Sequence, residues 1–179
     1  MRAMRVTFAA GTILAAVFSV AAVRVQRASP HDSVSASIGG ADISITYGRP
    51  YMRGRTIFGA LVPYGRVWCP GADEATTLSS SKPLRIGDLL LDAPQYTLWI
   101  LPTADEWQLV VNEQTGQWHT QYRAASDLGR VPLQKRTLET PVEQLTFALR
   151  KNADGSGGTI VFTWETTEAS VPFKVVTRP

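Results

Sequence analysis

Short apolar stretches alternate with turn residues along most of the chain. From Asp42, the segment D-I-S-I-T-Y places Ile43, Ile45 and Tyr47 on one side of an extended backbone, as in a half-buried β-strand. Further stretches rich in Val, Ile, Thr and aromatic residues follow at hairpin spacing. They cover residues 67–69, 76–79, 84–86, 89–91, 96–101, 107–112, 131–133, 145–150, 159–165 and 171–176. Only residues 114–128 leave room for a short helix, so the pattern predicts an all-β fold, an antiparallel β-sandwich.

The turns between these stretches support antiparallel pairing. Gly87 and Asp88 separate two apolar triplets, as in a tight hairpin. The loop 152–158, N-A-D-G-S-G-G, joins two long stretches and supplies residues that tolerate positive φ. Three of the five tryptophans, Trp99, Trp107 and Trp164, lie within apolar stretches and are predicted to fill the core. Trp68 and Trp118 neighbour turns, where partial burial beside a loop is the commoner arrangement.

The first residues have the features of an export signal. Arg2 and Arg5 precede an uncharged apolar run over residues 6–23, and Ser19-Val20-Ala21 resembles a cleavage site. We therefore predict a signal peptide over residues 1–21 and export to the periplasm or the cell exterior. An uncleaved inner-membrane anchor over residues 6–23 is the alternative. Residues 22–42, rich in Ser, Gly and Ala, are predicted to form a flexible tether, and residues 43–179 a single domain.

The charge and cysteine content exclude several classes of protein. Four of the 18 Lys and Arg lie at or before Arg27 and all 15 Asp and Glu follow it, so residues 28–179 carry a formal charge of −1. This near-neutral domain has neither the charge nor the motifs of a nucleic-acid-binding protein. Cys69 is the single cysteine, so the chain has no internal disulfide. We expect Cys69 to be a half-buried small residue, with a reactive thiol as the alternative.

Most residues that suggest a site lie between residues 47 and 76. Arg49 and Arg55, with Arg66, could form an anion site, because guanidinium groups bind carboxylates and phosphates in a fixed geometry. The interpretation we favour is structural: these arginines pair with Asp73 or Glu74 and hold an irregular corner. Asp73 and Glu74 would face opposite sides of a strand, and could converge only in a turn.

Metal, cofactor and triad chemistry receive little support from the sequence. His119 could join Cys69, Asp73 and Glu74 around a metal ion, but no H-x-H, H-x-x-E or C-x-x-C spacing is present. No G-x-S-x-G motif, phosphate loop or dinucleotide fingerprint occurs either. We therefore predict neither a metal nor a cofactor.

A set of linked motifs resembles a known bacterial family. The motifs are Tyr47-Gly-Arg-Pro50, Gly54-Arg55, Phe58-Gly59, Val62-Pro-Tyr-Gly65, Trp68, Gly71-Ala-Asp-Glu-Ala-Thr76, Tyr96-Thr-Leu-Trp99, Trp107…Asn112, Trp118…Tyr122 and Trp164-Glu165. Together they are similar to the family called domain of unknown function 2911. The resemblance implies an exported bacterial β-sandwich and no particular activity. This chain has Cys69 and Asp73 where the family tends to have Arg and Asn, Pro94 where it tends to have Gly, and His119 where it often has Gly.

These observations lead to one expected function and two alternatives. We expect a non-catalytic binding or structural domain of the cell envelope, which meets a small molecule, a glycan or an envelope protein. Its membrane contact is expected only through an uncleaved N-terminal segment. One alternative is an uncharacterised hydrolase that acts on an anionic or glycan substrate, with Glu74 or Asp73 as base; the other is a corner that only defines the fold. The predicted ligand contacts are Arg49, Arg55, Tyr64, Trp68, Asp73, Glu74 and His119.

Overall fold

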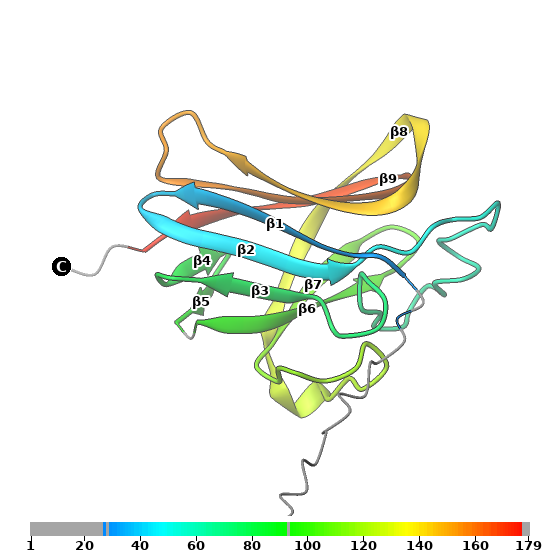
Figure 1. The fold of residues 1–179 in the computed structure, drawn as a ribbon, viewed down its shortest axis with the longest axis horizontal. Coiled ribbons are helices and arrows are strands. Elements are labelled where there is room, and N and C mark those ends of the chain that lie inside the picture. Colours follow the sequence, from blue (N-terminus) through cyan, green and yellow to red (C-terminus); the bar gives the residue numbers. More distant parts are fainter. Residues whose placement is uncertain (1–26, 28, 93, 177–179) are drawn as a thin grey trace, which may run out of the picture.

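The structure is a computed structural model that describes residues 27, 29–92 and 94–176. The described residues form nine strands and one turn of 3-10 helix, η1 (Ala124–Ser126) (Figure 1). The strands are β1 (His31–Ile38), β2 (Ala41–Gly48), β3 (Thr77–Ser80), β4 (Leu84–Ile86), β5 (Leu89–Leu91), β6 (Gln95–Pro102), β7 (Trp107–Asn112), β8 (Asp127–Lys151) and β9 (Gly157–Val175). The all-β prediction is confirmed.

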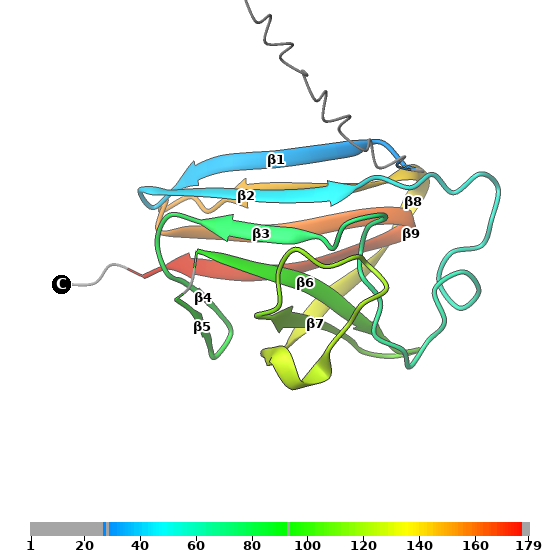
Figure 2. The same ribbon diagram turned by 60° about the horizontal axis from the view of Figure 1, so that its bottom comes forward.

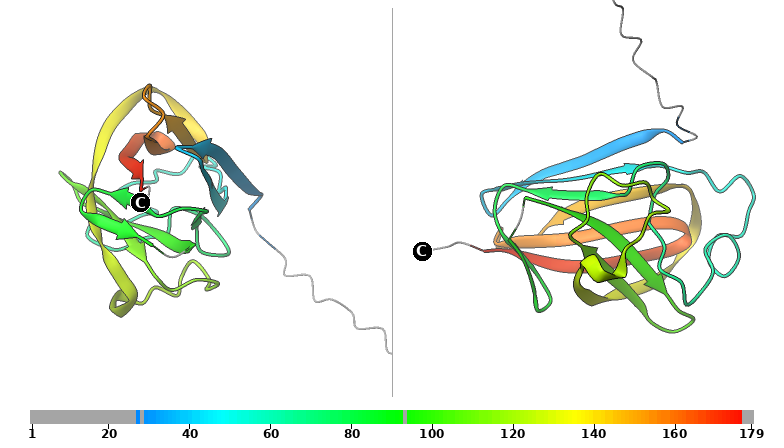
Figure 3. Two further views of the ribbon diagram at one scale, coloured as in Figure 1. Left: turned by 90° about the vertical axis from the view of Figure 1, so that its left-hand side faces the viewer. Right: turned by 90° about the horizontal axis from the view of Figure 1, so that it is seen from below.

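The strands pair in the order β1-β2-β3-β6-β7-β8-β9-β4-β5, and every pairing is antiparallel. The long strand β8 belongs to both layers of the sandwich. Its first part, residues 127–133, pairs with β7, and its second part, from Gln134 to Lys151, pairs with β9. The sheet therefore turns over along β8, and its two layers face each other (Figures 1 and 3).

The three tryptophans predicted to fill the core are all buried: Trp107 and Trp164 lie between the layers, and Trp99 lies in a second cluster with Cys69, Ala75 and Val110. Trp99, Trp107 and Trp164 are 1–2% exposed. Phe58 sets its ring against that of Trp107, with centroids 4.6 Å apart and an angle of 63° between the ring planes. Trp68 stacks on Trp164 at 5.9 Å and 15°. Buried aromatic surface of this kind supplies a large hydrophobic stabilisation.

The predicted tether is wrong for residues 31–42. His31–Ile38 forms β1, and it pairs residue by residue with β2. Its apolar positions are small and few, and Ile38 alone is fully buried, so the stretch has the composition of a linker although it completes the sheet edge. The predicted signal peptide and anchor lie in residues outside those that the structure describes. None of the helices in the described part is long and apolar enough to cross a membrane.

Three further strand predictions differ from the structure. The stretches 131–133 and 145–150 belong to the single strand β8, and 159–165 and 171–176 both contribute to β9. Register shifts near Val142 interrupt the pairing of β8 with β9, which explains why the apolar pattern breaks there. Residues 67–69 form no strand; Trp68 instead makes an isolated bridge to Ile100. The predicted hairpin at Gly87 is confirmed, with φ of 55°.

Candidate ligand-binding cleft

A cleft of about 620 Å³ opens at the end of the sandwich where the segment between β2 and β3 returns to the sheet. Figure 2 shows this segment running beyond the ends of β8 and β9 before it turns back to β3. The cleft is lined by residues from five parts of the chain: Ser29, Pro50, Tyr51, Arg53, Arg55, Leu61, Val67, Trp68, Cys69, Gly71, Ala72, Trp99, His119, Thr120, Tyr122 and Trp164. Its volume lies in the range of small-molecule sites.

The part of the cleft wall around Tyr51 is fixed to β8 by backbone hydrogen bonds. Met52 N donates to Glu143 O at 2.8 Å, and Leu145 N donates to Pro50 O at 3.1 Å. Tyr51 forms an isolated bridge with Gln144 between these two bonds. The side chain of Tyr51 is nevertheless 37% exposed. A rigid backbone therefore holds an accessible aromatic ring at the mouth of the cleft.

A left-handed turn follows at Arg53 and Gly54, with φ of 51° and 70°. Positive φ is uncommon for a residue other than glycine. Arg53 N donates to Glu143 Oε1 at 2.8 Å, which ties the turn to β8. Arg55 then folds back, and its Nε and Nη2 donate to Met52 O at 2.8 Å and Tyr51 O at 2.7 Å. The guanidinium of Arg55 thus closes the turn, and it has no carboxylate partner among the described residues.

Arg49 has a structural role outside the cleft. Its Nη1 pairs with Asp32 Oδ2 of β1 at 3.0 Å. Its Nε and Nη2 donate to Leu145 O at 3.1 Å and Thr146 Oγ1 at 2.9 Å, both on β8. Arg49 does have a carboxylate partner, but it is Asp32, on the strand that the sequence interpretation placed in a tether, and not Asp73 or Glu74. Arg49 thereby links the edge strand β1 to β8 across the sandwich.

Glu74 pairs with an arginine outside the segment. Arg27 donates to both carboxylate oxygens of Glu74, with the shortest contact, Nη2 to Oε1, at 2.8 Å. These hydrogen bonds lower the pKa of Glu74 below its usual range. His31 Nε2 lies 3.2 Å from Glu74 Oε2 and 3.4 Å from Asp73 Oδ2. The prediction that Asp73 or Glu74 pairs with Arg49, Arg55 or Arg66 is therefore wrong.

Asp73 shapes the cleft through its backbone. It is 5% exposed and adopts a left-handed conformation with φ of 66°. Its carbonyl oxygen accepts a hydrogen bond from His119 N at 2.8 Å, and His119 Nδ1 lies 2.7 Å from the same oxygen. Because a carbonyl can only accept, Nδ1 carries the hydrogen and neutral His119 keeps Nε2 as an acceptor. The turn at Asp73 thus orients the imidazole at the cleft.

The close approach of two backbones holds this turn in place. A side-chain carbon added to Gly48, the last residue of β2, would lie 2.2 Å from Ala72 O. Only glycine allows the end of β2 to touch the loop at that distance. Ala72 lines the cleft beside Gly71. The position of Gly71 and Ala72 in the cleft wall therefore depends on the absence of a Cβ atom at Gly48.

Two further residues of the cleft lining, Cys69 and Tyr122, are held in their neutral forms. Cys69 is 1% exposed, and burial raises the pKa of its thiol to about 11. The sulfur accepts a hydrogen bond from Thr76 N at 3.3 Å. Cys69 is thus a small buried residue, more deeply buried than predicted. Burial and the Asp127 carboxylate raise the pKa of Tyr122 to about 12, and its hydroxyl donates to Asp127.

The cleft contains three of the seven predicted contact residues: Arg55, Trp68 and His119 line it. Arg49, Tyr64, Asp73 and Glu74 do not, and Tyr64 is 46% exposed elsewhere on the segment. Sequence reasoning missed Tyr51, Arg53, Tyr122 and the edges of Trp99 and Trp164. Tyr51 and Arg53 lie between the predicted contacts Arg49 and Arg55 in the sequence, so their position could have identified them as lining residues. In the described part of the chain, no three His, Cys, Asp or Glu side chains form a metal-binding group.

Comparisons with known proteins identify the family without adding an activity. The sequence profile of a family described as "Protein of unknown function (DUF2911)" matches residues 29–173. No curated protein and no solved structure matches the chain. The match begins just before β1 and ends within β9, so it spans both layers of the sandwich and the whole cleft. The chain belongs to the DUF2911 family.

Proposed function

We propose that this protein is a non-catalytic domain of the cell envelope that binds a small ligand in the cleft beside Trp68. The observation that carries the proposal is the composition of the cleft. Three at least partly exposed aromatic residues, Tyr51, Trp68 and Tyr122, line it, and the buried rings of Trp99 and Trp164 lie behind them. No Asp or Glu is among its described lining residues. Concave, largely aromatic surfaces with a few fixed polar groups are typical of ligand sites. Aromatic and Arg side chains also contribute most of the binding energy at many contact surfaces.

The arrangement of polar groups favours binding over hydrolysis. A hydrolase usually needs a general acid and a general base on either side of the reacting bond. Asp73 and Glu74, the bases expected from the sequence, lie outside the lining and next to Arg27 and His31. The thiol of Cys69 is buried with a raised pKa, which keeps it from acting as a nucleophile. Among the described lining residues, His119 is the one that could serve as a base.

The cell-envelope part of the proposal rests on the sequence. The charged start, the apolar run and the small residues near Ala21 are typical of an export signal. An exported domain would meet the metabolites and glycan fragments of the envelope. Those compounds form the natural first panel of ligands.

A thermal-shift screen of the full-length chain tests the proposal. The panel would contain envelope metabolites, glycan fragments and divalent metal ions, and a ligand of the folded state raises Tm in a saturable way. Product analysis of each mixture by mass spectrometry would run in parallel. We expect at least one organic compound to raise Tm and to be recovered unchanged. Conversion of a compound to hydrolysis products would instead support the hydrolase, with His119 as its base.

A matched pair of variants localises any hit. Tyr51→Ala removes an exposed ring that lines the cleft, and Tyr64→Ala removes an exposed ring of the same segment that does not. We expect Tyr51→Ala to abolish most of the ligand-induced shift and Tyr64→Ala to preserve it. Equal shifts in the two variants would show that the ligand binds elsewhere.

A further inference from the structure

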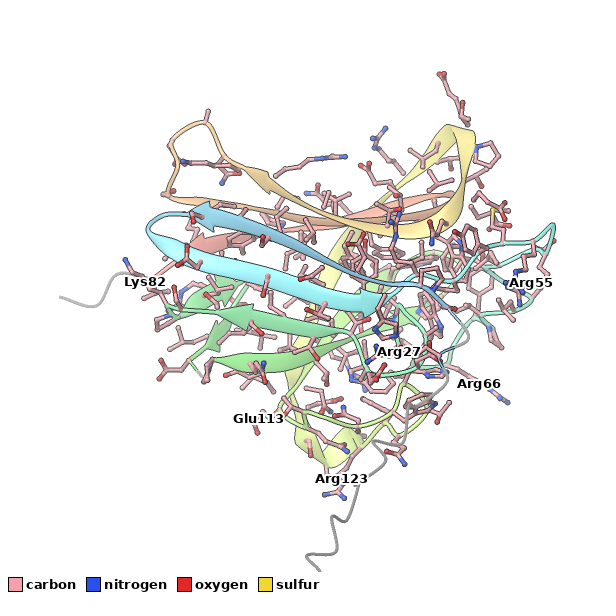
Figure 4. The ribbon with its side chains drawn as sticks, in the orientation of Figure 1. Arg27, Arg55, Arg66, Lys82, Glu113 and Arg123 are labelled. Carbon is pink, nitrogen blue, oxygen red and sulfur yellow. The ribbon has the colours of Figure 1, made fainter. Side chains whose placement is uncertain are left out.

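The charges that line the cleft have one sign. Arg53 and Arg55 are its only permanently charged lining residues among those the structure describes. Figure 4 shows Arg55 on the outer part of the segment between β2 and β3, whereas Arg66 points away from the molecule at another place. A cleft that has guanidinium groups and no carboxylate attracts anions and disfavours cations.

Hydrogen bonds within the protein already orient the guanidinium of Arg55. Its Nε and Nη2 are bound to the carbonyl oxygens of Met52 and Tyr51. Nη1 makes no hydrogen bond with any other residue that the structure describes. Because the guanidinium is already oriented, its Nη1 can donate to a ligand with little further loss of side-chain entropy, which favours binding.

The backbone of Arg53 is held by a hydrogen bond, whereas its side chain has no hydrogen-bond partner among the described residues. Its left-handed backbone is tied to the Glu143 carboxylate through the main-chain nitrogen. Its guanidinium makes no hydrogen bond or ion pair within the described part of the chain. Arg49 and Arg136, by contrast, each have a carboxylate partner. The side chain of Arg53 is therefore available to an acidic ligand.

The aromatic lining residues indicate a second property of the ligand, which is a ring. Trp68 stacks on Trp164 and meets the ring edge of Phe58, so those neighbours fix its orientation. Its indole N–H has no partner among the described residues, although the ring lines the cleft. Tyr51 and Tyr122 add two further partly exposed rings. Oriented aromatic surfaces favour a ligand that also presents a ring face.

We infer that the ligand of this cleft is a ring compound with an acidic group, a carboxylate or a phosphate, whose ring packs on Trp68 and Tyr51 and whose charge is met by Arg53 and Arg55. This inference rests on the proposed function and specifies its ligand class. An acidic sugar and an aromatic acid share this chemistry. The Nε2 of His119 can accept a hydrogen bond from a sugar hydroxyl.

Paired probes test the inference by isothermal titration of the full-length chain. One pair is glucuronate and its neutral counterpart methyl glucoside; the other is indole-3-acetate and its neutral counterpart indole-3-ethanol. We expect the acid of at least one pair to bind about tenfold or more tightly than its neutral counterpart, as a charge-assisted contact implies. The pair that shows the difference identifies the sugar or the aromatic source. Acids that bind no better than their neutral counterparts would overturn the inference.

Matched arginine variants connect the charge preference to the cleft. Arg53→Gln should weaken binding of the acid about tenfold and leave the neutral compound unchanged. Arg66→Gln removes an exposed arginine that does not line the cleft, and should change neither affinity. An acid that binds equally to wild type and Arg53→Gln would contradict the inference.

The outcomes separate this inference from the proposed function. If a neutral ring binds as tightly as its acid and Tyr51→Ala abolishes binding, the cleft is a binding site but its ligand is not selected by charge. If none of the four probes binds, the inference is wrong for this cleft. The proposed function falls as well only if the wider thermal-shift panel also gives no hit that depends on Tyr51.

Discussion

Glu74 holds Arg27, 47 residues earlier in the chain, through contacts to both of its carboxylate oxygens. The pair fastens the residues before β1 to the loop that leads into β3. This loop is the last part of the segment between β2 and β3, and Figure 4 shows Arg27 beside it. Both side chains are about half exposed, at 50% and 40%. An ion pair with this exposure contributes little to global stability and acts mainly on its own segment.

Glu74→Gln should therefore loosen residues 29–34 with only a small fall in Tm. The neutral amide keeps one acceptor for Arg27 but loses the charge that Arg27 and His31 both face. Hydrogen exchange of the backbone amides before and within β1 measures the effect. Glu139→Gln, at an exposed position of β8, is the control and should leave those amides unchanged. Equal exchange in wild type and Glu74→Gln would contradict this role.

Stability should fall at acid pH through Glu168. The Glu168 carboxylate is 5% exposed, and it accepts hydrogen bonds from Arg136 at 2.6 Å and Arg150 at 3.1 Å. The bond from Arg136, followed by that from Arg150, lowers the pKa of Glu168 in the folded state. The unfolded carboxyl, with a pKa of about 4.3, then binds protons at higher pH than the folded one. Stabilisation is complete above that value and is lost as pH falls through the folded pKa.

Urea unfolding between pH 7 and pH 3 measures this dependence. In Glu168→Gln the midpoint should start lower at pH 7 and decline less on acidification than in wild type. Identical pH slopes in the two proteins would show that Glu168 makes no contribution to acid sensitivity.

Cys69 should resist thiol reagents in the folded protein. Burial raises its pKa to about 11, so little thiolate exists at pH 8, and the sulfur is 1% exposed. We expect labelling by a disulfide reagent to proceed only as fast as the protein opens, and to become rapid in 6 M guanidinium. Rapid labelling of the native protein would indicate that a reagent in the cleft reaches the thiol, and would contradict its burial.

Gly48→Ala should destabilise the protein by about 1–3 kcal/mol, because the added carbon meets the backbone oxygen of Ala72 and one of the two segments must move. Gly129→Ala is the control. Its added carbon would lie 2.4 Å from Leu89 Cδ2, the end of a side chain that can rotate away. We expect a smaller loss in the control by urea unfolding. A loss in Gly129→Ala as large as in Gly48→Ala would contradict the account of the contact between β2 and the loop.

Most of the fold could be predicted because its strands alternate clearly. Ile43, Ile45 and Tyr47 are all buried on one side of β2, as their spacing indicates. β1 was missed although Val34, Ala36 and Ile38 alternate with serines, because the Ser, Gly and Ala content of the stretch is typical of a linker. The continuity of β8 was also hidden, because its pairing shifts register near Val142 and the apolar pattern stops there.

The site was less predictable because its partners are far apart in sequence. His31 and Arg27 face Glu74 from a stretch with the composition of a leader and tether, so an arginine within the segment was the nearest candidate. Trp68 and His119 reach the same cleft from segments that no local pattern connects. One difference from related sequences does have a physical explanation. Asp73, where the resemblance described above leads to an expectation of Asn, is left-handed, and both residue types tolerate that conformation.

A crystal structure of the full-length chain with the tightest ligand from the screen is the decisive test of the proposed ligand site. We expect the ligand to lie in the cleft, with its ring against Trp68 or Tyr51 and its acidic group within hydrogen-bonding distance of Arg53 or Arg55. A ligand bound at any other surface, with the cleft empty, would contradict the proposed site.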